Sequence, residues 1–246
     1  MLLAVDIGNT STKFGVFDGE ELVSRFDVPT DSDDLVGDID GRLDAKFDSA
    51  IVCSVVPEAG ERLERLLTHG YNVEPVFITT ELALGLRVKP ETLATLGADR
   101  FVNCFAAAEK YGVPVIACSF GTATTIDLVN KKRELVGGMI APGINLMARA
   151  LNEHTAKLPL IDPGVATVLG VTTESAIRVG LYASLVGMLE NAVATITAKN
   201  GKAKVIATGG HAEIVAAGTN LIDVVDPDLT LAGLRSIAAA INSKKK

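Results

Sequence analysis

The spacing of apolar residues along the chain predicts alternating strands and helices. Short apolar runs with the length and composition of buried strands lie at 2–5, 13–17, 22–26, 49–56, 76–78, 113–118, 134–140 and 205–207. Segments with apolar residues three and four apart, typical of amphipathic helices, lie at 31–43, 57–68, 101–111, 143–153 and 173–198, with further helices from 211 and 229. This order predicts an α/β fold of mixed sheets flanked by helices.

One strand–turn–strand pattern occurs twice in the chain. Residues 5–17 read Val-Asp-Ile-Gly-Asn-Thr-Ser-Thr-Lys-Phe-Gly-Val-Phe, and residues 118–129 read Cys-Ser-Phe-Gly-Thr-Ala-Thr-Thr-Ile-Asp-Leu-Val. The two copies are 113 residues apart, which is close to half of the 246-residue chain. The repeat therefore predicts two similar domains, residues 1–111 and 112–246.

The turn of the first copy has the side chains of a phosphate-binding loop. Gly8 permits a tight turn, Asn9 and Thr10 offer polar groups to phosphate oxygens, and Lys13 adds a positive charge. Asp6, at the end of the strand, suits Mg²⁺ held through water, because Mg²⁺ keeps much of its hydration shell. A plain hairpin with local turn hydrogen bonds is the alternative. The repetition of the pattern favours the phosphate loop.

Two further glycine turns are candidates for nucleotide binding. In the second copy, Gly121 and Thr122 repeat the phosphate turn, although a Thr-rich strand also accounts for them. Gly209 and Gly210 follow a strand and precede a helix, which lets a flat ring or a phosphate reach the backbone. A tight strand–helix turn explains this pair equally well.

A carboxylate and a guanidinium stand side by side before a helix, in the sequence Gly97-Ala98-Asp99-Arg100. Asp99 can accept a proton from a hydroxyl, and Arg100 can bind a carboxylate through two hydrogen bonds. Together they suit a substrate with a hydroxyl and an anionic end. The alternative is an N-capping aspartate followed by a surface arginine.

Composition and charge indicate which classes of partner and which cellular compartment to expect. The net charge of −7, with scattered basic residues, argues against nucleic acid, because such sites usually carry a basic face. No apolar run reaches about 18 residues, so we expect no membrane span. The cysteines Cys53, Cys104 and Cys118 lack metal-ligand spacing and indicate buried thiols in a reducing cytosol. The protein is therefore expected to be cytoplasmic.

Seven segments together resemble a known family. Three of them resemble the phosphate 1, phosphate 2 and adenosine motifs of the acetate kinase, sugar kinase, heat-shock-70 and actin superfamily: Asp-Ile-Gly-Asn-Thr at 6–10, Gly-Thr-Ala-Thr-Thr at 121–125 and Ala-Thr-Gly-Gly at 207–210. Four more narrow the resemblance to the type III pantothenate kinase family: Leu-Gly-Ala-Asp-Arg at 96–100, Gly-Gly-Met-Ile-Ala-Pro-Gly at 137–143, Thr-Ala-Lys-Leu-Pro at 155–159 and Asp-Pro-Asp-Leu-Thr-Leu-Ala-Gly-Leu at 226–234. The resemblance covers residues 2–240.

The resemblance implies duplicated actin-like (ribonuclease H-like) domains, each with a five-stranded mixed sheet flanked by helices, and ATP in the interdomain cleft. The implied activity is phosphorylation of pantothenate, the first step of coenzyme A biosynthesis, with Asp99 as general base. Residues implied to bind ATP and Mg²⁺ are Asp6, Gly8, Asn9, Thr10, Lys13, Gly121, Thr122, Gly209 and Gly210. Residues implied to bind pantothenate are Gly97, Ala98, Arg100 and Thr173. Members of the family are homodimers in which the partner subunit closes the pantothenate pocket, and they usually need K⁺ or NH₄⁺.

The chain departs from the family pattern at two positions. The family has an aspartate that ligates the monovalent cation where this chain has Ser119, so we expect weak turnover and little response to K⁺. Many members have a substrate-contacting tyrosine where this chain has Pro90. With Asp6, Ser119 is the candidate metal position. The alternatives are a degenerate homologue that binds nucleotide or pantothenate and regulates a partner, and a kinase for another small hydroxyl compound.

Overall fold

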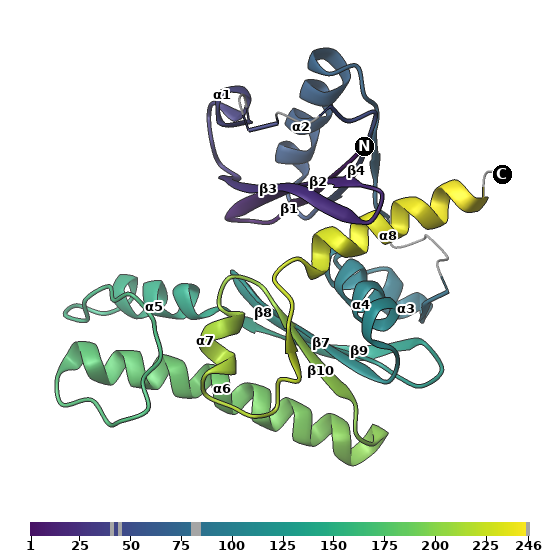
Figure 1. Cartoon of the computed structure of the whole chain (residues 1–246). Helices are drawn as coiled ribbons and strands as arrows, with labels where there is room; N and C mark the ends of the chain where they lie inside the picture. The colour runs from purple at the N-terminus through teal and green to yellow at the C-terminus, as the bar shows by residue number, and fades with distance from the viewer. Residues whose placement is uncertain (40–41, 44–45, 80–84, 245–246) are drawn as a thin grey trace. The chain divides into compact units, whose positions relative to one another are not determined.

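The computed structural model describes residues 1–39, 42–43, 46–79 and 85–244, and Figure 1 shows its elements. The chain folds into two compact units. Unit 1 contains Met1–Leu86, Pro90–Ala106 and Asp228–Lys246, and unit 2 contains Arg87–Lys89 and Ala107–Pro227. The chain passes from unit 1 to unit 2 inside α4 (Ala98–Tyr111) and returns just before α8 (Leu229–Lys244).

Unit 1 is built on a five-stranded mixed sheet, as predicted, in the order β3-β2-β1-β4-β5. Its strands are β1 (Leu2–Ile7), β2 (Ser11–Asp18), β3 (Glu21–Pro29), β4 (Ser49–Ser54) and β5 (Pro75–Phe77). β1, β2 and β3 form antiparallel pairs, whereas β4 is parallel to both β1 and β5. Side chains alternate along a strand, so Val5 and Ile7 of β1 enter the core and Asp6 takes the opposite face.

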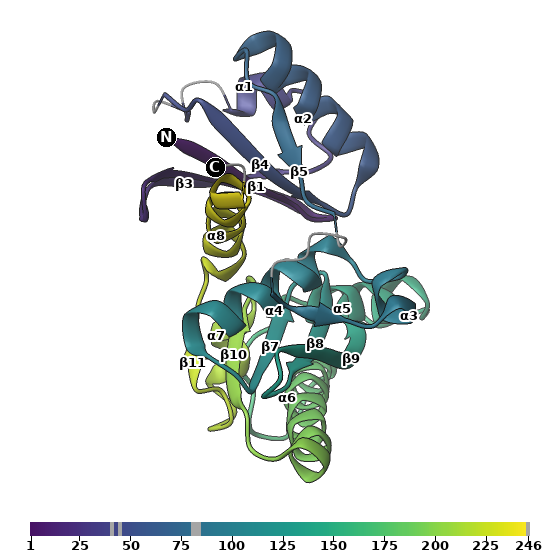
Figure 2. The same cartoon turned by 90° about the vertical axis from the view of Figure 1, so that its right-hand side faces the viewer.

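Helices cover both faces of the unit 1 sheet. α2 (Pro57–Gly70) begins at a proline, whose fixed φ suits the first helical position, and it buries Leu63 and Leu67 against the sheet. α8 lies on the other face, as Figure 2 shows. The remaining helices are α1 (Leu35–Ile39), α3 (Pro90–Leu93) and the first part of α4. The helix expected at 31–43 is thus limited to α1, and residues 40, 41, 44 and 45 lie outside the described part.

Unit 2 contains a six-stranded mixed sheet in the order β11-β10-β7-β8-β9-β6. Its strands are β6 (Arg87–Val88), β7 (Val115–Phe120), β8 (Ala123–Val129), β9 (Glu134–Pro142), β10 (Lys204–Thr208) and β11 (Val224–Val225). The prediction of five strands is wrong here, because β6 comes from the first half of the sequence and adds to β9 in parallel. A two-residue strand is too short to show a recognisable alternation of apolar residues.

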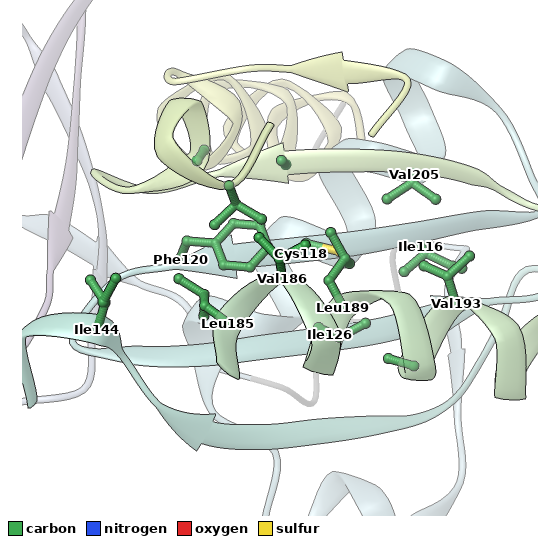
Figure 3. Close-up of a cluster of buried hydrophobic side chains, with 14 of the residues drawn as sticks. Ile116, Cys118, Phe120, Ile126, Ile144, Leu185, Val186, Leu189, Val193 and Val205 are labelled. Atoms are coloured by element: carbon green, nitrogen blue, oxygen red, sulfur yellow. The ribbon is translucent and has the colours of Figure 1, made fainter. Parts of the chain in front are cut away.

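The helices of unit 2 are α5 (Ile144–Glu153), α6 (Thr173–Asn200) and α7 (Ala212–Ala216). Figure 3 shows the main core, in which α6 contributes Leu185, Val186, Leu189 and Val193, and the sheet contributes Ile116, Cys118, Phe120, Ile126 and Val205. By length and composition alone, α6 could cross a membrane. The expectation that no segment is apolar enough to cross a membrane is therefore not confirmed. The apolar residues of α6 are explained by the burial of one face of the helix against the sheet.

The two sheets repeat one topology. In unit 1, β1 pairs antiparallel with β2 and parallel with β4, and in unit 2, β7 pairs antiparallel with β8 and parallel with β10. The duplication read from the sequence is therefore a duplication of fold. The predicted division at residue 111 follows the repeat, whereas the compact units follow contacts and place α8 with unit 1. All three cysteines are buried and free, as predicted.

Candidate functional site

Four side chains from adjacent strands form a row on one face of the unit 1 sheet. Cys53 on β4, Asp6 on β1, Lys13 on β2 and Asp27 on β3 are register partners in that order. Directly opposed residues share a face of the sheet, so two carboxylates flank one ammonium group. Asp27 was not identified from the sequence, because only the strand register brings it beside Lys13.

The carboxylate of Asp6 lies in an environment that favours its neutral form. The pKa of Asp6 is raised from 3.8 to about 6, mainly by burial; Lys13 lowers the pKa, and the carboxylates of Asp99 and Asp27 add smaller increases. Burial, followed by Asp6 and Asp99, also raises the pKa of the Cys53 thiol, which therefore stays protonated. The row has an excess of negative charge that a bound cation would offset.

The loop between β1 and β2 is held by backbone and hydroxyl hydrogen bonds. The Gly8 N–H donates to the Ser11 carbonyl at 3.1 Å, and the Thr30 hydroxyl donates to the Gly8 carbonyl at 2.7 Å. Thr30 Oγ1 also lies 3.0 Å from Thr12 Oγ1, and its backbone N–H donates to the Thr10 carbonyl at 3.2 Å. Asn9 and Thr10 are exposed at the tip. The sequence did not identify Thr30, which fixes the loop from the next strand end.

Asp99 and Arg100 occupy the first turn of α4, in the same unit as the β1–β2 loop. Asp99 Oδ1 lies only 2.5 Å from the position that a Cβ would take at Gly97, so the carboxylate folds back over the glycine. A side chain at residue 97 would displace this carboxylate. Asp99 is the second residue of the helix, which begins at Ala98, so it does not occupy the N-cap position that the alternative interpretation gave it.

The donors around Asp6 fit Mg²⁺ carried in with phosphates. Among the described residues, no group of three or more His, Cys, Asp or Glu side chains forms a complete metal site. Mg²⁺ commonly binds through one or two carboxylates, several waters and substrate phosphates. A single carboxylate at the strand end, beside a loop with exposed polar side chains at its tip, satisfies this requirement.

In unit 2, the β7–β8 turn is packed against the start of α5. The Gly121 N–H donates to the Ala123 carbonyl at 3.1 Å, and the Gly143 N–H donates to the Thr122 carbonyl at 2.8 Å. A Cβ at Gly143 would overlap the carbonyl oxygens of Gly121 and Thr122. The sequence pointed to Gly143 only as part of a family motif, and the structure shows that its lack of a side chain permits this contact.

Gly209 brings the end of β10 onto the same turn. Its φ of +93° favours glycine, and a Cβ there would lie 2.6 Å from the Phe120 carbonyl oxygen. The His211 N–H donates to that oxygen at 3.1 Å, and Gly210 stays exposed. The second phosphate turn and the glycine pair, identified separately in the sequence, are therefore neighbours at the end of β7.

Ser119 lies in a row of hydroxyl side chains. Its register partners are Thr125 on β8 and Thr208 on β10, which are both buried, while Ser119 is half-buried. The equivalent row around Asp6 in unit 1 carries charges, whereas this one is neutral. The structure thus places Ser119 where the repeat predicted it. The neighbouring side chains carry neutral hydroxyl groups, which attract a cation less strongly than carboxylates do.

Thr173 lies at the start of a long helix of unit 2. It is exposed and begins α6, and the preceding Thr172 caps the helix by a reciprocal bond with Ser175. Pro90 begins α3, ahead of the Gly97–Arg100 segment.

Comparison with known proteins identifies the family. The model of type III pantothenate kinase matches residues 2–195. A type III pantothenate kinase of Acidiphilium cryptum is 41% identical over 97% of this chain and 94% of that protein, and one of Agathobacter rectalis is 37% identical over 99% of each. A Campylobacter jejuni protein described as a Baf family transcriptional activator has a similar structure, with TM-score 0.64, 22% identity and coverage of 98% and 99%.

A more distant structure supports the fold. The activator of 2-hydroxyisocaproyl-CoA dehydratase from Clostridium difficile, with bound ADPNP, has TM-score 0.55 at 9% identity and covers 99% of this chain and 97% of its own. These likenesses agree with the repeated sheets and show the duplicated actin-like α/β fold. The near full-length similarity to the curated relatives shows that this chain belongs to the type III pantothenate kinase family.

Proposed function

We propose that the protein transfers the γ-phosphoryl group of ATP to the primary hydroxyl of pantothenate, giving 4'-phosphopantothenate for coenzyme A biosynthesis. The observation that carries this proposal is that Asp99 and Arg100, in the first turn of α4, belong to the same compact unit as Asp6 and the phosphate loop. A base, an anion-binding group and a metal-binding carboxylate in one unit are the groups that this reaction needs. Membership of the family supports the same conclusion.

In the proposed reaction, the pantothenate hydroxyl oxygen forms a bond to the γ-phosphorus while the bond from that phosphorus to the bridging oxygen of ADP breaks. Asp99 accepts the hydroxyl proton, and Arg100 binds the pantothenate carboxylate. Backbone N–H groups of the Gly8 loop, with Lys13, hold the phosphates. Bound Mg²⁺, held by Asp6, would neutralise charge on the phosphates. Positioning and charge neutralisation provide most of the acceleration in phosphoryl transfer.

We propose that the remaining nucleotide contacts come from unit 2, with Thr122 and Gly121 at the phosphates and Gly209 and Gly210 at the adenosine. The proximity of these two turns at the end of β7 supports this assignment. Thr173 would contact pantothenate from the partner subunit of a homodimer.

Dimer formation and a cytoplasmic location are parts of the same proposal. An apolar segment before α6 is strongly exposed, with Val168 at 78%, Leu169 at 87% and Val171 at 97%. Exposed apolar patches of this kind favour contact with another protein surface. Gly180 and Gly187 on the exposed side of α6 would allow a second helix to approach closely. The three buried free cysteines suit a reducing compartment.

A coupled assay of ADP release with ATP, Mg²⁺ and pantothenate tests this function, run in K⁺ and in Na⁺, with the product identified by mass spectrometry. We expect pantothenate-dependent ADP release and a product heavier by one phosphoryl group. ADP release that does not depend on pantothenate would contradict the proposal.

A second candidate function is that of a nucleotide-binding regulatory protein, and Ser119 is the observation that favours it. A homologue that has lost its cation ligand could keep ATP binding without turnover. ATP binding by calorimetry, combined with no phosphorylated product in either cation, would select this alternative.

A further inference from the structure

The C-terminal segment 226–234 has no contact with ATP or pantothenate in the proposed function, yet it makes buried polar contacts. Thr230, in the first turn of α8, donates its hydroxyl hydrogen to Asn103 Oδ1 at 2.7 Å, and both residues are only 6% exposed. The two residues are 127 positions apart in the sequence. A buried polar group without a partner is strongly unfavourable, so this bond ties α8 to α4 at one point.

Asn103 lies on the same side of α4 as the candidate substrate residues. It follows Asp99 by four positions and Arg100 by three, and residues at these spacings are neighbours on a helix surface. A contact that fixes Asn103 therefore fixes the helical turn that carries the proposed base and the proposed carboxylate-binding group.

A close backbone approach reinforces the hydrogen bond one turn further along α8. A Cβ at Gly233 would lie 2.8 Å from the Ala106 Cβ and 3.0 Å from Val102 Cγ1. Any side chain at residue 233 would push α8 away from α4. The glycine thus sets the separation of the two helices.

The other side of α8 packs on the sheet that carries Asp6. α8 contacts β1, β2 and β4, and Leu231 Cδ1 lies 3.1 Å from the position of a Cβ at Gly15. An ion pair of 3.0 Å joins Asp228, just before α8, to Arg25 on β3. α8 therefore lies against both the strand that ends at Asp6 and the helix that begins at Asp99, all within unit 1.

The same segment also holds the far end of α4, within unit 2. Asp226 is buried and accepts hydrogen bonds from Lys110 Nζ at 2.8 Å and from Tyr111 Oη at 2.7 Å. Lys110 follows Asn103 by seven residues, or about two helical turns and 10 Å. These bonds hold the end of α4 that belongs to unit 2.

We propose that Thr230 and Gly233 are positioning residues that hold Asp99 and Arg100 in place relative to Asp6. The inference rests on the proposed function, in which Asp99 takes the proton and Arg100 binds the pantothenate carboxylate. A shift of about 1 Å in reacting groups can cost about 100-fold in rate. The effect should fall on pantothenate, because the phosphate loop is held separately by Thr30.

Thr230→Val tests the proposal, because it keeps the shape of the side chain and removes the hydroxyl. We expect kcat/KM for pantothenate to fall at least about 10-fold, while the Kd for ATP alone stays near the parent value. Thr230→Ser, which restores the hydroxyl, should recover most of the loss. Ser236→Ala is the matched control, because that hydroxyl donates to the Ala232 carbonyl within its own helix. Equal losses in Thr230→Val and Ser236→Ala would overturn the proposal.

A double variant distinguishes an effect on the position of α4 from the destabilising effect of an unpaired Asn103. Asn103→Leu with Thr230→Val removes both polar partners, and such paired replacements can leave stability almost unchanged. If the hydrogen bond sets the position of α4, the pantothenate defect persists in the folded double variant. Recovery of the parent kcat/KM would show that an unpaired Asn103 caused the loss, and the proposal would be wrong.

Hydrogen exchange distinguishes failure of this inference from failure of the proposed function. If the parent protein shows no pantothenate-dependent ADP release, the proposed function fails, and the positioning role is then judged on the backbone amides of residues 101–106. These amides should exchange faster in Thr230→Val and at the parent rate in Ser236→Ala. Unchanged exchange in both variants would exclude a positioning role for Thr230.

Discussion

At the residue scale, the two copies of the hairpin differ most at one place. Asp6 in unit 1 has Lys13 and Cys53 as register partners, and Ser119 in unit 2 has Thr125 and Thr208. The first row carries charge and the second carries only hydroxyls. A row of hydroxyls can bind phosphate oxygens, but it attracts a monovalent cation less strongly than a carboxylate does.

The substitution Ser119→Asp should therefore produce a rate that K⁺ stimulates. We expect the parent protein to turn over slowly, with similar rates in K⁺ and Na⁺, and the variant to respond in kcat or in the ATP KM. Ser119→Asn, of similar size without the charge, is the control and should stay unresponsive. Strong K⁺ activation of the parent, unchanged by the substitution, would show that Ser119 suffices for cation binding.

Asp99→Asn should abolish turnover and leave ATP binding intact. Asparagine keeps the shape and the hydrogen bonds but does not accept a proton, and loss of a general base costs about 10²- to 10⁴-fold in rate. Steady-state kinetics and calorimetric titration of ATP measure the two effects. A variant with nearly parent kcat would mean that another group takes the proton.

Arg100→Ala should raise the pantothenate KM far more than the ATP KM. A hydrogen bond to a charged group contributes about 1.5–3 kcal/mol, which corresponds to roughly 10- to 100-fold in binding. Pantetheine, which lacks the carboxylate, should be a poor substrate for the parent protein and should lose little in the variant. Equal use of pantothenate and pantetheine by the parent would argue against carboxylate binding by Arg100.

At the element scale, the β7–β8 turn and the start of α5 form one structural feature. Gly143→Ala should disturb it, because the new methyl group would overlap the carbonyl oxygens of Gly121 and Thr122. We expect a loss of stability of about 1–3 kcal/mol, as for overpacking elsewhere, together with a higher ATP KM. Gly164→Ala is the control, because no atom lies within 4 Å of its added Cβ. Chemical denaturation measures the stability of both variants, and kinetic titration with ATP measures their KM for ATP.

At the scale of the whole molecule, we predict a homodimer. The exposed side of α6 and the apolar segment before it, around Val168 and Val171, would be covered by a second copy of the chain. Light scattering at micromolar concentration should give about twice the 25.7 kDa mass of one chain. Val171→Asp, which puts a charge at this exposed position, should shift the mass toward the monomer without lowering the unfolding temperature. A monomeric parent would contradict the prediction.

The sequence by itself determined the repeated α/β fold and the nature of the candidate site. Apolar runs predicted the positions of the strands, because burial requires a regular side-chain period. The second copy of the turn, around Gly121, indicated that the first copy was not an ordinary hairpin. Asp99 and Arg100 were identified because adjacent groups of opposite charge are visible without a structure. Local patterns of this kind depend on neighbours along the chain.

Only the tertiary structure decided which distant residues meet. The row of Asp6, Lys13 and Asp27 depends on strand register, and the roles of Thr30 and Thr230 depend on hydrogen bonds to segments far away in the sequence. The two-residue β6 joins unit 2 through pairing with β9, which no periodicity could indicate. These features arise from contacts between residues far apart in the chain. A single sequence shows which residues are present but not which of them come into contact.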